Sequence, residues 1–275
     1  MSADRVVLER GKDTSLTVHL FGATVISWKC NGSEILFLSK KSLFDNKKAI
    51  RGGIPVCFPQ FGPWDLGPQH GFARISTWTL EQAPKTLSSG DVTAVFTLTD
   101  NDETRKMWNH GFKVTYTLTL KETEFVSDFV VKNTGEDSFS FTALLHTYLG
   151  VSDVTKATVS GLKGLQYIDK VKEGKVFTEQ RELVTIPENY DRVYMNTQGG
   201  HIVHDTATGK TIIIKKTNLP DTVVWNPWEE KAKAMSDFGD DEYPKMLCVE
   251  AGHVSSPVTL DPGASFVAGQ VIVAK

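Results

Sequence analysis

Two ionisable side chains stand in strongly apolar stretches of the sequence, where they could act as an acid and a base. His146 lies in SFSFTALLHTYL, and strand alternation would place it on the face opposite the phenylalanines. Glu250 lies in MLCVEAGHV, where desolvation would raise its pKa toward neutrality, as a general base requires. Structural interpretations remain open for both: a hydrogen-bonded core histidine, and a salt bridge from Glu250 to Arg51 or Arg74.

A second group of polar side chains lies in residues 51–74, RGGIPVCFPQFGPWDLGPQHGFAR. Four prolines and five glycines make this segment a shaped loop, because neither a helix nor a central strand would accommodate them. The donor groups of the loop suit a polyoxygenated or anionic ligand. They belong to Arg51, Gln69, His70 and Arg74. A surface crossing with solvated charges is the alternative, although long loops without secondary structure are uncommon unless they are functional or disordered.

Composition limits the classes of function. The chain has 275 residues, of which 40% are hydrophobic, so it can form a sizeable core without a disulfide or a metal. Its net charge of −3 lacks the basic surplus of a nucleic-acid-binding protein. Cys30, Cys57 and Cys248 form no CxxC pair and are expected to be free thiols. The first residues show no apolar signal segment and no stretch resembles a membrane span, so we expect a cytoplasmic protein with no membrane partner.

The elements that must position these side chains are predicted to be antiparallel strands. Short runs rich in Val, Ile, Thr and aromatic residues alternate with Gly and Asn turns, and no segment has the long helical period of a βαβ unit. The predicted strands are 5–9, 15–21, 24–29, 34–38, 77–81, 91–99, 112–121, 124–132, 138–149, 210–216, 221–225, 246–250 and 265–274. Short helices are expected within 101–111 and 228–236, and the acidic run 237–243 is interpreted as a solvated loop. The class is therefore all-β, and periodicity alone leaves sandwich or barrel open.

Several motifs occur in an order that resembles one family. They are RGGIP.CFPQFG and PQHGFAR in the loop, HTYL at 146–149, LPDTVVWNPW at 219–228 and CVEAGHV at 248–254. Together they resemble the hexose-6-phosphate mutarotases, also called glucose-6-phosphate 1-epimerases, of the aldose 1-epimerase superfamily. The resemblance implies a single galactose mutarotase-like β-sandwich over residues 1–275, and weakly favours a monomer.

The resemblance also implies roles for particular residues. Glu250 matches the base that takes the proton from the anomeric hydroxyl, and His146 matches the acid that protonates the ring oxygen. The implied substrate is a hexose 6-phosphate, which such a pair interconverts between α and β anomers with no metal and no organic cofactor. The matching substrate contacts are Arg51, Gln69, Arg74 and Asp191, with His70 as a weaker candidate. Trp225 and His253 would either line the pocket or only shape it.

Two other functions fit an all-β chain. A metal-dependent cupin-like isomerase would need clustered ligands, but the one close histidine pair, His201 and His204, has a spacing that points to opposite faces of a strand. A non-catalytic carbohydrate-binding module could use the same arginines and tryptophans. Only His146 and Glu250 distinguish the enzyme from the binding module, because a module needs no acid-base pair.

Overall fold

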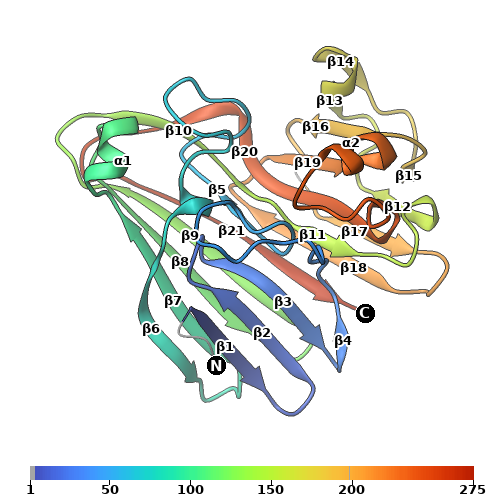
Figure 1. Cartoon of the computed structure of the whole chain (residues 1–275), viewed down its shortest axis with the longest axis horizontal. Helices are drawn as coiled ribbons and strands as arrows, with labels where there is room; N and C mark the ends of the chain where they lie inside the picture. Colours follow the sequence, from blue (N-terminus) through green and yellow to red (C-terminus); the bar gives the residue numbers. More distant parts are fainter. Residues whose placement is uncertain (1–3, 198) are drawn as a thin grey trace.

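The structure is a computed structural model that describes residues 4–197 and 199–275, and its strands form three antiparallel sheets (Figure 1). The first sheet has the order β1 (Arg5–Arg10), β2 (Thr14–His19), β3 (Thr24–Cys30), β4 (Ser33–Glu34). The second, which we call the central sheet, has the order β14 (Lys175–Thr178), β13 (Gln166–Asp169), β16 (Tyr190–Tyr194), β19 (Asp221–Asn226), β20 (Met246–Leu260), β10 (Phe139–Leu145), β5 (Val56–Cys57), with β11 (Tyr148–Gly150) also paired to β20. The third has the order β15 (Val184–Thr185), β12 (Ala157–Ser160), β17 (His201–Asp205), β18 (Thr211–Thr217), β21 (Ser265–Ala274), β9 (Glu124–Asn133), β8 (Phe112–Leu120), β7 (Val92–Thr99), β6 (Thr79–Thr86).

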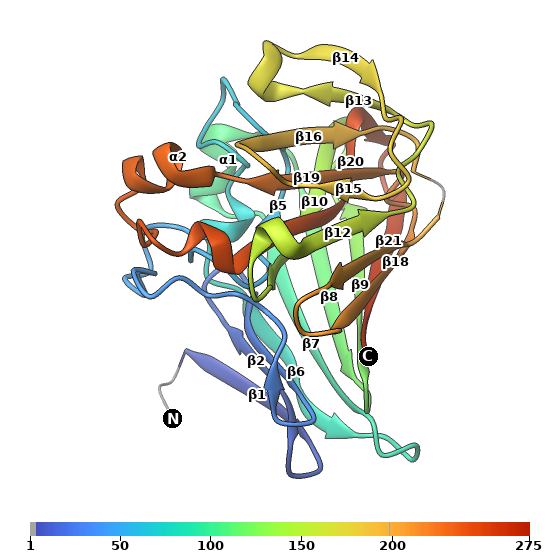
Figure 2. The same ribbon diagram turned by 90° about the vertical axis from the view of Figure 1, so that its right-hand side faces the viewer.

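Helices are short and peripheral (Figure 2). They are α1 (Asp102–Met107), α2 (Trp228–Ala234) and the 3-10 turns η1 (Ala73–Ile75), η2 (Val154–Lys156), η3 (Lys170–Lys172) and η4 (Tyr243–Lys245). Both predicted helices are confirmed, and Asn101 caps α1 by accepting hydrogen bonds from the amides of Glu103 and Thr104. No helix in the described part of the chain has the length and apolar character needed to cross a membrane.

The central and third sheets pack face to face, so the fold is a sandwich and not a barrel. Alternate residues of β8 are buried, from Phe112 to Leu120, as its period of two predicts. They meet Phe139, Phe141 and Leu145 of β10 in one apolar core. Phe58, from the long loop, lies in the middle of this core, with its ring centroid 5.4 Å from those of Phe112 and Phe141. The loop is therefore anchored between the sheets, with its polar residues left for the rim.

The predicted strand 138–149 is wrong as one element, because the structure divides it into β10 and β11. The amide of His146 leaves the ladder and donates to the carbonyl of Pro55 at 3.0 Å. A register shift also separates Phe141 from Ala143 where β10 pairs with β20. The break ties His146 to the long loop on one side and keeps it beside β20 on the other.

Other boundaries also differ from the prediction. The segment 51–74 is mainly irregular, as predicted, but it contributes the two-residue strand β5 to the edge of the central sheet and the turn η1. Predicted strand 34–38 is reduced to β4 and two isolated bridges, at Leu36 and Leu38. Strands β6 and β20 run five and ten residues beyond their predicted ends at 81 and 250, because exposed polar residues continue the ladders where sequence patterns give no signal.

Candidate active site

The seven side chains nominated from the sequence all line one pocket on the face of the central sheet that points away from the third sheet. The pocket encloses about 320 Å³. Its walls are Arg51, Phe61, Gln69, His70, Arg74, His146, Lys170, Asp191, Val223, Trp225, Met235 and Glu250. Trp225 therefore lines the pocket, whereas His253 lines a different hollow beside Lys216.

Strand register explains why residues so distant in sequence meet here. Asp191 of β16 pairs with Trp225 of β19, which pairs with Cys248 of β20, and Cys248 pairs with Tyr148 of β11. Glu250, two residues after Cys248, projects from the same face of β20. The loop 51–74 then closes the pocket from the β5 edge of the sheet.

His146 and Glu250 face each other at the floor of the pocket. Their Nδ1 and Oε1 atoms are 3.3 Å apart, and the two side chains are 10% and 1% exposed. The ring of His146 stacks on Tyr148 at 4.6 Å with an interplanar angle of 11°. Glu250 thus lies against the histidine, and the alternative of a salt bridge to Arg51 or Arg74 is wrong for the structure described.

The surroundings of this pair shift both pKa values toward the uncharged forms. Burial raises the pKa of Glu250 well above its usual range, and Asp191 adds to the shift, while Lys170 and Arg74 oppose it. Burial lowers the pKa of His146, with His70, Arg74 and Arg51 adding to the effect. These shifts favour a single proton on the pair, carried by Glu250 beside a neutral His146. A nearby negative charge would be needed to favour the reverse arrangement, in which His146 is the acid and Glu250 the base.

The two arginines differ in their partners. Arg51 bonds Asp237 and the hydroxyl of Tyr148, both at 3.2 Å. Although burial opposes the charged form, these two groups hold the pKa of Arg51 above its usual range. Arg74 donates to the carbonyl of Gln69 at 2.8 Å, and burial lowers its pKa. Because no carboxylate of the described chain pairs with Arg74, an anionic ligand would satisfy it best.

His70 is held as a neutral ring. Its Nδ1 accepts a hydrogen bond from the amide of Gly62 at 3.1 Å, and its φ of 67° places it in the left-handed region. Burial lowers the pKa of His70 to about 3, and Arg74, Lys170 and Arg51 contribute. Since Nδ1 accepts, the neutral ring carries its proton on Nε2. His70 therefore holds the loop through Nδ1 and also lines the pocket.

The sequence did not single out Lys170, Tyr148 or Asp237. The interpretation of the acidic run 237–243 as a solvated loop is wrong in two places. Asp237 pairs with Arg51, and Glu242 is buried and accepts hydrogen bonds from Ser39 Oγ and the amide of Gly239. Their burial depends on contacts with residues nearly 200 positions earlier, so local composition gave no signal.

One group of potential metal ligands does occur in the described residues. Donor atoms of His146, Cys248 and Glu250 lie within 4.8 Å of one another. Burial raises the pKa of the Cys248 thiol well above its usual value, with Glu250 adding to the shift. A metal would need the thiolate, so this donor set fits a resident metal poorly. The other histidine pair behaves as predicted: His201 is buried and His204 lies on the opposite face of β17.

His201 should make the stability of the protein depend on pH. It is fully buried with Nε2 2.7 Å from Thr222 Oγ1, and burial lowers its pKa to about 4, with Lys216 contributing. The unfolded chain would bind this proton near pH 6.5, so stability should fall as the pH drops from about 6.5 to 4, by on the order of 1.4 kcal/mol per unit. Urea unfolding should show that the free energy of unfolding falls more between pH 7 and pH 5 in the wild type than in His201→Gln. Equal losses would contradict this assignment.

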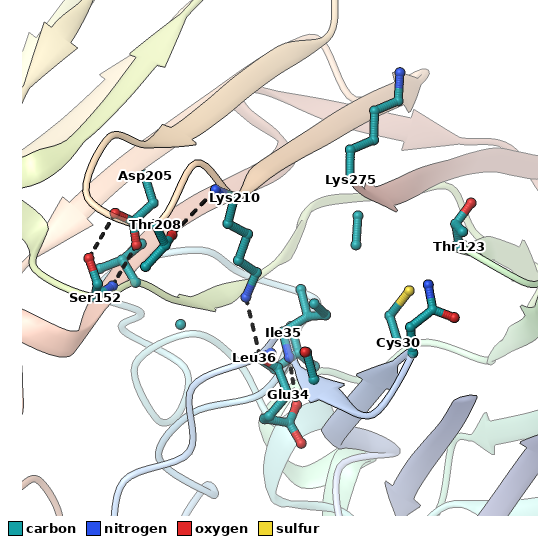
Figure 3. A pocket seen from close by; sticks show the side chains of 15 residues that line it. Cys30, Glu34, Ile35, Leu36, Thr123, Ser152, Asp205, Thr208, Lys210 and Lys275 are labelled. Atoms are coloured by element: carbon teal, nitrogen blue, oxygen red, sulfur yellow. Dashed lines mark hydrogen bonds between the residues drawn. The ribbon is translucent and has the colours of Figure 1, made fainter. Parts of the chain in front are cut away.

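A larger hollow of about 860 Å³ lies between β3, β4 and the C-terminal end of β21 (Figure 3). Its acidic groups are already engaged. Asp205 accepts from the amide and hydroxyl of Ser152, both at 2.7 Å, and Glu34 accepts from several backbone amides. Lys210 donates to the carbonyl of Glu34 at 3.2 Å. This hollow offers no adjacent acid and base among the described residues, so the smaller pocket is the candidate active site.

Comparison with known proteins agrees with this assignment. The aldose 1-epimerase family matches residues 4–272. A protein of Cenchrus ciliaris named "Putative glucose-6-phosphate 1-epimerase" is 41% identical over 267 residues, which cover 94% of this chain and 81% of that one. A protein of the same name from Escherichia coli K12 is 38% identical, with 86% and 79% covered.

Solved structures share the fold. The crystal structure of a "putative mutarotase" from Salmonella typhimurium superposes with a TM-score of 0.89 at 31% identity, covering 98% of this chain and 89% of that one. A Synechocystis protein at 19% identity, with a TM-score of 0.85 and coverages of 98% and 95%, supports the fold alone. The all-β, galactose mutarotase-like sandwich, the buried His146–Glu250 pair and the family match agree with one another: the chain belongs to the aldose 1-epimerase family.

Proposed function

We propose that this protein interconverts the α and β anomers of glucose 6-phosphate and related hexose 6-phosphates. The observation that carries the proposal is the His146–Glu250 pair, 3.3 Å apart at the floor of a pocket whose rim bears Arg51 and Arg74. The names of the relatives from Cenchrus ciliaris and Escherichia coli support the same substrate class.

The reaction needs one proton at each end of the bond that breaks. Glu250 takes the proton of O1, and the O1–H electrons form the C1=O1 double bond as the C1–O5 bond breaks. The electron pair left on O5 takes the proton of His146, giving the open-chain aldehyde. Rotation about C1–C2 followed by the reverse steps closes the ring on the other face of C1. Atoms and electrons balance, and the enzyme ends each cycle with its single proton back on His146.

The arginines of the pocket would couple the binding of an anionic substrate to the protonation of His146. Burial lowers the pKa of His146 and so disfavours the imidazolium that the acid step needs. A phosphate beside Arg74 would bring negative charge near His146 and raise its pKa again. Gln69 and Asp191 would hold hydroxyl groups of the sugar, as amide and carboxylate groups do.

The direct test is the anomerisation of freshly dissolved α-glucose 6-phosphate, followed by the NMR signals of the two anomeric protons. The rate of approach to equilibrium should rise in proportion to the protein concentration. Saturable binding of the sugar phosphate with no increase over the spontaneous rate would contradict the proposal and indicate a carbohydrate-binding module.

We expect the activity to be independent of divalent metal. The Cys248 thiol is held in its protonated form and the acid-base pair completes the reaction by itself. Dialysis against EDTA should leave kcat unchanged in the same assay. Loss of activity in EDTA, restored by a divalent ion, would contradict the mechanism.

The remaining features of the proposal concern the state of the protein. Three buried cysteines without a disulfide suit the reducing cytoplasm. We further propose that residues 1–275 act as one domain and as a monomer, with the sugar phosphate as the only partner and no nucleic acid. Size-exclusion chromatography with light scattering tests the oligomeric state, where a mass near 30.4 kDa is expected.

A further inference from the structure

The groups that line the pocket follow one another in the order of the strands. From one edge of the central sheet to the other, β16 carries Asp191, β19 carries Trp225, β20 carries Glu250 and the β10–β11 break carries His146. Neighbouring strands are ~4.8 Å apart. Arg51 and Arg74 come from the loop that contains β5, which pairs with β10, so they reach the pocket from the side of His146.

Lys170 lies at the far end of this order. In β13, Asp169 pairs with Arg192 of β16, so the next residue, Lys170, falls beside Asp191 on the pocket side. Its ammonium is 4.2 Å from the ring centroid of Phe61 and makes no ion pair with the described residues. The carboxylate of Asp191 likewise has no hydrogen bond or ion pair from the described part of the chain. A donor and an acceptor therefore stand side by side, both available to a ligand.

A buried polar network fixes the turn that carries Lys170. Asp169 caps η3 by accepting from the amides of Val171 and Lys172. Its other oxygen accepts from Nε of Arg192 at 3.0 Å. Arg192 and Asp191 are consecutive in β16, so their side chains point to opposite faces. The same strand thus holds Asp191 in the pocket and anchors the base of Lys170 from behind.

Sugar geometry assigns a part of the substrate to each end of this row. In a pyranose, C1 lies between O5 and C2, and C6 leaves from C5 on the far side of O5. With O1 at Glu250 and O5 at His146, the 6-phosphate must extend toward the arginines. The hydroxyls at C2 and C3 then extend toward β16 and β13.

We infer that Lys170 contacts the substrate and donates a hydrogen bond to the C2 and C3 hydroxyls, while Asp191 accepts from them. This inference rests on the proposed function. Lys170 then takes no part in phosphate recognition. Lys170 and Asp191 then bind the sugar ring at one end of the pocket, and the arginines bind the phosphate at the other. Lys170 is solvent-exposed, so its contribution is that of a single ordinary hydrogen bond.

The test is Lys170→Met assayed on glucose 6-phosphate and on free glucose. We expect kcat/KM to fall by about 3–10-fold on both sugars in equal proportion, the range of one net hydrogen bond. Lys170→Arg should retain most of the activity, because it keeps a donor. Lys172→Met is the matched control: Lys172 belongs to the same turn but packs over Phe177, and its loss should change neither value.

The outcomes separate this inference from the proposed function. A wild-type protein that does not accelerate anomerisation refutes the proposed function and the inference with it. An active wild type with a Lys170→Met variant of equal activity refutes the inference alone. If Lys170→Met lowers kcat/KM only for glucose 6-phosphate, Lys170 binds the phosphate, and the inference is also overturned.

Discussion

Replacing Glu250 with glutamine should lower kcat for anomer interconversion by about 10²–10⁴-fold, the usual share of general acid-base catalysis. The amide would keep the shape of the side chain but could not take the proton of O1. KM should change less, because the acid-base step contributes mainly to the transition state. His146→Ala should have an effect of similar size, since the ring oxygen would lose its proton donor. Both values come from the NMR assay on purified enzyme.

Folding must be checked in parallel, because both residues are buried. Burial raises the pKa of Glu250, so folding at neutral pH carries the cost of protonating or desolvating this carboxylate, which glutamine avoids. Glu250→Gln should therefore unfold at a temperature equal to or above that of the wild type. A folded Glu250→Gln variant with near-normal kcat would show that another group acts as the base. The same result for His146→Ala would remove the assigned acid.

Replacing Arg74 with methionine should reduce the ratio of kcat/KM for glucose 6-phosphate to kcat/KM for free glucose. A charge-assisted hydrogen bond contributes ~1.5–3 kcal/mol, so kcat/KM for glucose 6-phosphate should fall by roughly 10–100-fold. Activity on glucose should change little, because that substrate has no phosphate. Arg74 is the sharper choice than Arg51, whose replacement would also leave Asp237 without its partner. The ratio of the two kcat/KM values is the quantity to measure.

Arg105→Met is a suitable control for this experiment, since Arg105 is a partly exposed arginine paired with Asp100 at 2.7 Å, outside the pocket. It should leave both substrates unaffected. Equal proportional losses on glucose and glucose 6-phosphate in Arg74→Met would mean that Arg74 holds the loop or the sugar ring, and that the phosphate lies elsewhere.

The period of two in the sequence was sufficient to predict the class of fold and most strands. In a sandwich, alternate residues of a strand are buried, so the strand's own sequence alternates between apolar and polar residues, as in β8. Periodicity failed where tertiary contacts decide. The division of 138–149 at His146 depends on a hydrogen bond to Pro55, and the two-residue β5 depends on a neighbour almost 90 positions later. Neither contact leaves a trace in local composition.

The seven nominated side chains do converge on one pocket, but the sequence alone could not bring His146 and Glu250 together. They are 104 positions apart, and only the register of β19, β20 and β11 places them face to face. Lys170 was missed because it stands in DKVKEGK, which reads as a solvated charged turn. Its relation to Asp191 appears only when β13 is placed beside β16.

A crystal structure with bound glucose 6-phosphate tests most directly how the sugar is oriented in the pocket. We expect O1 within hydrogen-bond reach of Glu250, O5 at His146, and the phosphate against Arg74. We also expect the C2 and C3 hydroxyls beside Asp191 and Lys170. A sugar bound in the reverse sense, with its phosphate at Lys170 and C1 away from the His146–Glu250 pair, would contradict this orientation.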